Sequence, residues 1–186
     1  MTELDAVYQP KDYEDRIYKD WIDQGLFRAT RDDPRDTFTI LMPPPNVTSA
    51  LHMGHGTGYT MQDVLVRWKR MQGYNALWLP GTDHAGIATQ MMVEKSLAEQ
   101  GKTRQEVGRE AFTKMLWDWK DKHGGRILDQ VKAMGWSCDW ERLAFTMDEN
   151  LSKSVIKVFV DLYNKGLIYK DKKLVNWDTV LKTAIS

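Results

Sequence analysis

Two histidines three residues apart, His52 and His55, have the types and spacing to do chemistry in this sequence. Their spacing places both rings on one face if a helix begins there. The free amides and the dipole of a helix N-terminus attract anions, and two imidazoles add donors for phosphate oxygens. Gly54 lies between them and leaves room for a bulky ligand against the backbone. The run therefore predicts a helix start that binds phosphate.

The histidines follow a proline-rich approach, Pro43-Pro44-Pro45-Asn46-Val47-Thr48. Prolines hold an extended path and end a strand, because they cannot donate the hydrogen bonds of a sheet. Thr48 and Ser49 supply hydroxyl or backbone donors in the loop that leads to the histidines. We expect this loop and the helix start to form one ligand site.

A second cluster, Gly81-Thr82-Asp83-His84-Ala85-Gly86, occupies a tight turn after a short apolar run. A carboxylate at Asp83 can hold the ammonium group of a ligand by a charge-assisted hydrogen bond. It can equally serve as the N-cap of the next helix, since Asp is a favoured capping residue. The spacing leaves both interpretations open.

Two other interpretations of the histidines remain open from the residues. They can be metal ligands, with Asp83 or His84 completing the site. We expect no metal site, because the pattern lacks a clear third protein ligand and the general base of an HExxH motif. They can also be ordinary histidines with satisfied hydrogen bonds, which is the commoner case for an isolated pair.

The elements that must position these clusters alternate along the chain. Residues 37–42 and 76–79 read as strands, and residues 51–72 and 84–100 as helices. Such alternation predicts an α/β fold with a parallel sheet and flanking helices. Ligands of such sheets bind beyond the carboxyl ends of the strands, where both clusters fall. Residues 1–36 form a helical lead-in, and residues 37–186 the main domain.

The second half of the chain predicts a helical extension. Capping-box spacing occurs at Thr103–Glu106 and at Thr146–Glu149, and Gly124-Gly125 is expected to interrupt or kink the first of the two helices. Residues 167–169 and 173–177 are expected to form a small hairpin. Apolar stripes assigned to the core are Met61, Val64, Leu65, Trp68 and Met71 on one helix, and Leu151, Val155, Val158, Phe159 and Leu162 on another.

Composition narrows the function classes. The 186 residues carry 26 basic and 26 acidic side chains, so no global basic field indicates nucleic acid, although a local basic patch is not excluded. Cys138 is the single cysteine, which excludes an internal disulfide and a cysteine zinc cluster. No apolar stretch has the length needed to cross a bilayer. These features favour a cytoplasmic protein without a membrane partner.

The run Pro45–Thr48 followed by Leu51-His52-Met53-Gly54-His55 resembles the HIGH signature of the class I aminoacyl-tRNA synthetases, and in detail that of the valine-specific members. The runs 81–90, 145–148 and 174–178 resemble the same group. The resemblance covers essentially the whole chain. It implies the first half of a Rossmann-like nucleotide-binding domain over residues 37–186, ending where an editing domain inserts.

The resemblance also implies a reaction. Valine is activated by ATP, with Mg²⁺ accompanying the nucleotide and no tightly bound cofactor, and is then ligated to tRNA(Val). By resemblance, His52 and His55 are catalytic and contact the ATP phosphates, with Thr48 and Gly54 in the ATP site. Residues implied for valine are Pro43, Pro44 and Asn46, which line its pocket, and Asp83, which holds its ammonium group.

Two departures from the family affect these expectations. Ser49 stands where the family usually has glycine, which permits close backbone approach or a positive φ. Family members are several times longer, so the resemblance implies that the second half of the nucleotide fold, its Lys-Met-Ser-Lys-Ser loop and the anticodon-binding helices are missing here. The expected partner is that remainder. The alternatives are a binding or regulatory fragment without ligase activity, and another nucleotidyltransferase.

Overall fold

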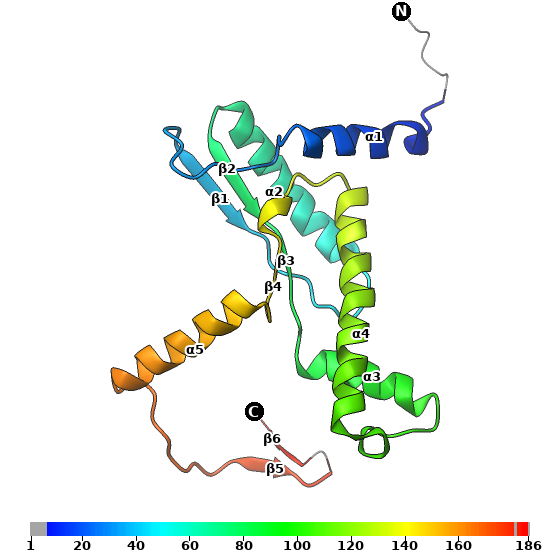
Figure 1. The fold of residues 1–186 in the computed structure, drawn as a ribbon, viewed down its shortest axis with the longest axis vertical. Helices are drawn as coiled ribbons and strands as arrows, with labels where there is room; N and C mark the ends of the chain where they lie inside the picture. The colour runs from blue at the N-terminus through cyan, green and yellow to red at the C-terminus, as the bar shows by residue number, and fades with distance from the viewer. Residues whose placement is uncertain (1–6, 181, 186) are drawn as a thin grey trace, which may run out of the picture. The chain divides into compact units, whose positions relative to one another are not determined.

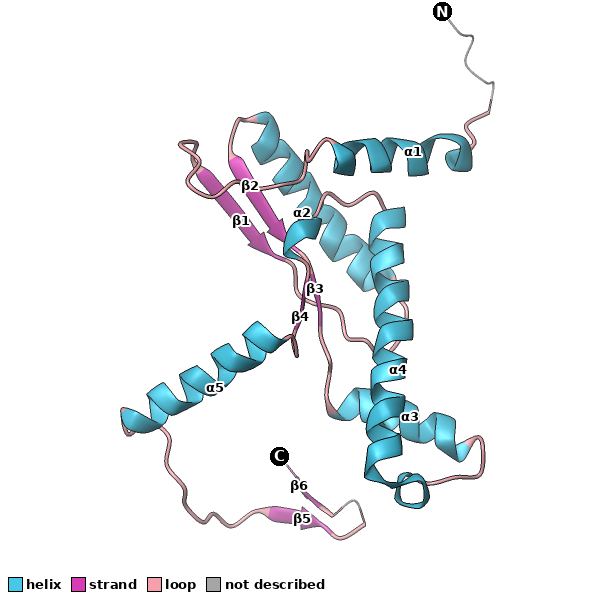
Figure 2. Ribbon diagram, in the orientation of Figure 1, coloured by secondary structure: helices cyan, strands magenta, loops and turns pink. Residues whose placement is uncertain are grey.

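The computed structural model describes residues 7–180 and 182–185. Its elements, shown in Figures 1 and 2, divide into one compact unit up to Met147 and a second from Asp148. The first unit contains α1 (Pro10–Asp23), β1 (Thr37–Leu41), α2 (Met53–Met71), β2 (Asn75–Leu79), β3 (Gly81–Thr82), α3 (Ile87–Ala98), α4 (Arg104–Ala133), a 3-10 turn (Trp140–Arg142) and β4 (Ala144–Phe145). The second contains α5 (Glu149–Asn164), β5 (Asn176–Asp178) and β6 (Thr183–Ile185).

The predicted parallel α/β arrangement is confirmed in the first unit. Strands β1 and β2 pair in parallel from Thr37–Asn75 to Leu41–Leu79, and α2 connects them and packs against both (Figure 1). Strands β3 and β4 form a second short parallel pair. The main core lies between the sheet, α2 and the end of α4. Its buried members are Met42, Tyr59, Val66, Ala76, Trp78, Val131, Trp136 and Cys138.

The apolar stripe predicted to be the core face of α2 is wrong. Met61, Val64, Leu65, Trp68 and Met71 are all exposed. The buried residues of α2 are Tyr59, Asp63 and Val66, which lie at helical spacing on a different face. Helix α2 therefore has more apolar surface than two strands cover, and the described residues leave its second apolar face open.

The kink predicted at Gly124-Gly125 is also wrong. Helix α4 runs through both glycines, and its one residue with non-helical backbone angles is Gly108, at φ 79° and ψ 164°. Gly124 is buried, and a Cβ placed there would lie 3.6 Å from Val47 Cγ1. This glycine brings α4 close to the proline-rich loop. The capping box predicted at Thr103 and Glu106 is confirmed.

Three expectations for residues after 145 are corrected. Thr146 forms no capping box, because its hydroxyl bonds to Asp83 and His84, and the N-cap residue of α5 is Asp148. The predicted inner face of α5 is not buried, because the second unit is too small to enclose it. The hairpin lies further along the chain than predicted, with β5 antiparallel to β6. None of the described helices is long and apolar enough to span a membrane.

Candidate functional site

Backbone pairing joins the two predicted clusters. Beyond the ends of β1 and β2, Asn46 and Asp83 form a parallel bridge. The Val47 amide donates to the Asp83 carbonyl oxygen at 3.0 Å, and the Asp83 amide donates to the Pro45 carbonyl oxygen at 2.8 Å. The clusters therefore meet at the carboxyl ends of the parallel strands, as the alternation of strands and helices predicted.

A hydroxyl of α2 anchors the first of the three prolines. Tyr59 is buried, and its hydroxyl donates to the Pro43 carbonyl oxygen at 2.7 Å. Desolvation by burial raises the pKa of Tyr59 to about 12, so the hydroxyl keeps its proton as a donor at neutral pH. The proline run is thus fixed to the same helix that carries the two histidines.

The two histidines cap the helix that they begin. His52 is the N-cap residue, and its Nδ1 accepts from the Gly54 amide at 3.1 Å. His55 Nδ1 accepts in return from the His52 amide at 3.3 Å, and the ring centroids lie 4.0 Å apart. Because each Nδ1 is an acceptor, each neutral ring carries its proton on Nε2. Both rings can therefore offer an N–H donor to a ligand.

The electrostatics of His55 favour this neutral form. Desolvation by burial lowers its pKa, and the neighbouring His52 ring lowers it further. Protonation would also replace the Nδ1 lone pair that accepts from the His52 amide. His55 is therefore a neutral hydrogen-bond donor at the N-terminus of α2. No group of three or more His, Cys, Asp or Glu side chains capable of holding a metal ion occurs within residues 7–180 and 182–185.

A cavity of about 450 Å³ opens beside these rings. Its lining combines the proline run, the loop after it and the first two turns of α2. Seven of the eight predicted site residues line it: Pro43, Pro44, Asn46, Thr48, His52, Gly54 and His55. The predicted valine residues and the predicted ATP residues, Asp83 apart, therefore share one continuous space.

Asp83 is the predicted site residue that does not line this cavity. The contacts of its carboxylate with described residues fall on Oδ1, which accepts from the Ala85 amide at 3.1 Å and from the Thr146 hydroxyl at 3.1 Å and lies 3.3 Å from His84 Nδ1. The alternative that Asp83 caps the next helix is wrong, because the N-cap residue of α3 is Gly86. Its carboxylate instead holds a turn beside Asn46.

The turn after Asp83 has unusual backbone geometry. Ala85 and Gly86 both have positive φ, at 53° and 45°. This region is uncommon for a residue with a side chain, and such strain persists only where surrounding contacts enforce it. The hydroxyl of Thr146 supplies one such contact, since it lies 2.9 Å from the His84 amide and 2.6 Å from His84 Nδ1. Thr146 thus orders Asp83 and His84 together.

Ser49 lies in the cavity lining without a positive φ, so its backbone does not require glycine. Its hydroxyl donates to the carbonyl oxygen of its neighbour Ala50 at 3.3 Å. Of the two reasons for a glycine at this position, only close approach of a ligand applies here.

Sequence reasoning missed four residues that shape the site. Tyr59, Trp119 and Gln130 each bond to the backbone between Pro43 and Leu51, and Thr146 bonds to Asp83. No local pattern marks the first three, because their partners lie 16 to 79 positions away. Thr146 lies in the run 145–148 that resembles the synthetases, and this resemblance could have identified it as a site residue.

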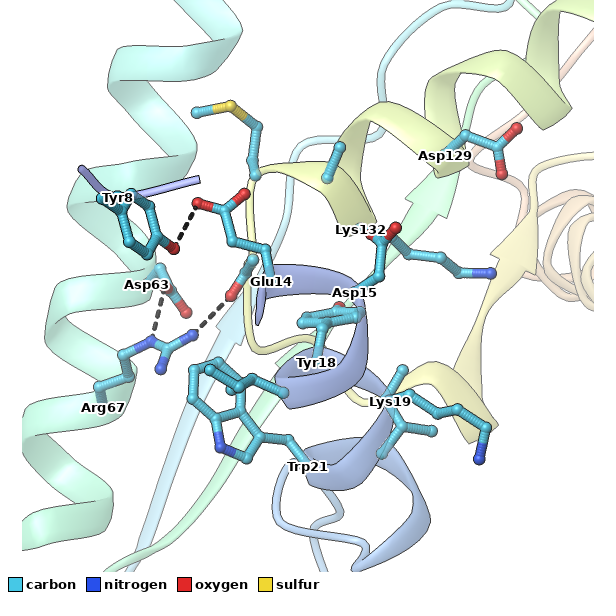
Figure 3. A pocket seen from close by; sticks show the side chains of 15 residues that line it. Tyr8, Glu14, Asp15, Tyr18, Lys19, Trp21, Asp63, Arg67, Asp129 and Lys132 are labelled. Carbon is cyan, nitrogen blue, oxygen red and sulfur yellow. Dashed lines mark hydrogen bonds and ion pairs between the residues drawn. The ribbon is translucent and has the colours of Figure 1, made fainter. Parts of the chain in front are cut away.

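A different cavity, of about 740 Å³, lies where α1, α2 and the end of α4 meet (Figure 3). Two hydrogen bonds lie in its lining: Tyr8 donates to Glu14 at 3.1 Å, and Arg67 donates to Asp63 at 2.7 Å. The Arg67 guanidinium also stacks over Trp21, with 5.2 Å to the ring centroid. We assign these contacts to the attachment of α1 to the core.

Comparison with a solved structure identifies the fold. The crystal structure of a LeuRS–tRNA–LeuAMS ternary complex from Agrobacterium radiobacter K84 superposes with a TM-score of 0.77 at 26% identity, covering 96% of this chain and 21% of that one. The chain therefore has the fold of one part of a class I synthetase catalytic domain. The predicted Rossmann-like fold class is confirmed.

The sequence is similar to curated relatives named valine–tRNA ligase. That of Pelagibacter ubique is 60% identical over 179 residues, covering 96% of this chain and 20% of the relative. That of Gluconobacter oxydans is 53% identical over 183 residues, covering 98% and 21%. The chain spans about one fifth of the length of these relatives. A family model described as tRNA synthetases class I (I, L, M and V) matches residues 16–186, and the chain belongs to this family.

Proposed function

We propose that this chain forms the part of a valine–tRNA ligase that binds ATP and valine. One observation carries the proposal. A single cavity joins the proline run to two imidazole rings with free Nε2–H donors at the N-terminus of α2, in a chain 60% identical to a valine–tRNA ligase. A helix N-terminus with additional N–H donors suits the phosphates of a nucleotide.

In this proposal His52 and His55 act on the nucleotide. The carboxylate of valine attacks the α-phosphorus of ATP, the bond to the bridging oxygen breaks, and pyrophosphate leaves. The carboxylate is already ionised at neutral pH, so no general base is required. The Nε2–H groups of both rings donate to phosphate oxygens as negative charge shifts toward pyrophosphate, which is electrostatic stabilisation by preorganised donors. Thr48 and Gly54 line the same ATP site.

Valine is bound next to the nucleotide. Pro43, Pro44 and Asn46 line its pocket, and Asp83 holds its ammonium group. The contacts of the Asp83 carboxylate with described residues fall on Oδ1, which leaves Oδ2 as the oxygen for the ligand. An apolar pocket discriminates poorly against a side chain that only adds a hydroxyl, so threonine is the expected competitor.

The remaining partners follow from the proposed reaction. Mg²⁺ accompanies ATP as part of the substrate, and the valyl group passes to the terminal ribose of tRNA(Val) in a cytoplasmic setting. Complete turnover requires the parts of the relatives that this chain does not span. Such parts are expected to supply further donors for pyrophosphate, because removing one transition-state donor typically costs about 100-fold or more in rate.

A graft tests the proposal. The aligned 179 residues of the Pelagibacter ubique enzyme are replaced by those of this chain, and valine-dependent ATP–pyrophosphate exchange is measured. We expect exchange that valine stimulates and isoleucine does not. Stimulation by isoleucine would overturn the assignment of valine, and an inactive but folded graft would overturn the assignment of function.

The 186-residue chain itself tests the fragment alternative. Calorimetric titration with ATP and with a non-hydrolysable valyl-adenylate analogue measures binding without turnover. Tight binding of the analogue by a chain that catalyses no exchange would favour a binding or regulatory fragment. Failure of both ligands to bind the isolated chain, beside an active graft, would show that this half-site needs the remainder.

A further inference from the structure

Helix α4 contacts the backbone of the loop that leads to the histidines. We propose that Trp119 and Gln130 of α4 are positioning residues, which hold the stretch from Val47 to Leu51 in the shape that receives ATP. The inference rests on the proposed function and adds two residues that contact no expected substrate atom.

The two hydrogen bonds hold the two ends of this stretch. The Trp119 indole Nε1–H donates to the Val47 carbonyl oxygen at 3.0 Å. The Gln130 side-chain Oε1 accepts from the Leu51 amide at 2.9 Å. Thr48, Ser49 and Ala50 lie between them and line the cavity. The segment that faces the nucleotide is therefore tied at both ends to one long helix.

Packing fixes the helix against the loop. The Val47 side chain is fully buried, and α4 presents Gly124 to it. The Trp119 ring stacks on His123, with centroids 4.0 Å apart and 19° between planes, which holds the indole in the orientation that donates to Val47. The bond to Trp119 thus lies in a packed interface rather than on a mobile surface.

The consequence for catalysis follows from order in the loop. Residues 48–52 belong to no helix or strand, and fixing the backbone of such a segment on ligand binding costs free energy. The hydrogen bonds with Trp119 and Gln130 order this segment before ATP binds, so ATP binding does not incur this cost. Leu51 directly precedes His52, so its tie to Gln130 also sets where the capped helix begins. The proline run is tied separately, through Tyr59.

Because α4 and Tyr59 hold different parts of the loop, we expect substitutions on α4 to affect the KM values of the two substrates differently. Loss of either hydrogen bond to α4 should raise the KM for ATP while the KM for valine stays nearly unchanged. Pro43, Pro44 and Asn46 lie on the part of the loop that Tyr59 holds, and the carboxylate of Asp83 is held separately by Thr146. A general loss of structure would raise both and lower the melting temperature.

The variants are Trp119→Phe, which keeps an aromatic ring without the N–H donor, and Gln130→Met, which keeps length without the acceptor. Gln130→Glu restores an acceptor and should restore function. Trp117→Phe and Gln105→Met are matched controls on α4, since both wild-type side chains are exposed and bond to no residue of this loop.

The first measurement is hydrogen exchange of the Leu51 amide in the 186-residue chain. We expect loss of protection in Gln130→Met and retained protection in Gln130→Glu. Unchanged protection in Gln130→Met would overturn the proposed tie. This readout needs no catalytic activity.

The second measurement is the KM for each substrate in valine-dependent exchange by the graft. We expect the KM for ATP to rise about fivefold in Trp119→Phe and in Gln130→Met, the effect of one lost hydrogen bond. Active variants with unchanged KM for ATP, or with equal rises for ATP and valine, would overturn the positioning role alone. A wild-type graft without exchange would overturn the proposed function instead.

Discussion

His55 has two roles that substitution can separate. Its Nδ1 completes the reciprocal capping of α2. In the proposed function its Nε2–H also donates to a phosphate of ATP. The sequence suggested only the second role, since it is set by residue type and spacing. The first role emerges from the rotamers of both rings, which place each Nδ1 against a backbone amide.

The His55→Ala and His55→Gln variants separate these roles. Alanine removes both, and we expect it to destabilise the chain by about 1 kcal/mol through the lost cap. Glutamine at this position can still accept from the N-cap amide, so its melting temperature should stay near wild type. Both variants of the graft should lose exchange by about 100-fold or more. Wild-type exchange in His55→Gln would assign His55 to the helix cap alone.

Thr146 offers a second test at the residue scale. Its hydroxyl donates to Asp83 Oδ1, and Thr146→Val removes that donor at nearly constant volume. We expect the KM of the graft for valine to rise about fivefold while the KM for ATP is unchanged. Thr146→Ser keeps the hydroxyl and should behave like wild type. Asp83→Asn should raise the KM for valine further, and equal effects on both substrates would contradict the ammonium role of Asp83.

At the scale of elements, α2 shows where a pattern misled. Apolar residues occur on two of its faces, and helical periodicity does not indicate which face a sheet will cover. The structure buries Val66, at 0% exposure, and leaves Val64 60% exposed. The kink predicted in α4 was wrong for a different reason. Two adjacent glycines weaken a helix locally, but packing against Val47 keeps α4 continuous.

The pair Val64→Ala and Val66→Ala tests the assignment of faces on α2. The substitution is the same, so only the surroundings differ. We expect Val66→Ala to lower the free energy of unfolding by about 2 kcal/mol, from lost burial and a cavity. Val64→Ala should change it by less than about 0.5 kcal/mol. Equal losses in chemical denaturation would mean that the Val64 face is covered in solution.

At the scale of the whole molecule, stability should depend on pH through two histidines. Desolvation by burial lowers the pKa of both His55 and His123. The neighbouring His52 ring lowers the pKa of His55 further, and Lys122 and Arg126 lower that of His123 further. The unfolded chain therefore binds protons more readily than the folded one, and stability is fully present above the ordinary histidine pKa of 6.5. Stability falls as pH drops from 6.5 toward the lowered pKa values of the two histidines and then levels off.

Melting temperatures measured from pH 7.5 to pH 5 check this dependence. The double variant His55→Gln and His123→Gln should lose most of the decline in this window. An unchanged decline in the double variant would assign it to other groups. The Asp33 carboxylate, whose pKa the hydrogen bonds from Arg35 lower to about 2, stays ionised throughout the window.

The sequence by itself determined the local geometry of this protein. The cap at Thr103, the helix end at Gly25, the parallel strands around α2 and the paired histidines all follow from residue type and short-range spacing. Only the tertiary structure decided which partners these elements meet. Trp119 reaches Val47 across 72 positions, and Gln130 reaches Leu51 across 79. Such contacts depend on how whole elements pack, and no local pattern encodes that packing.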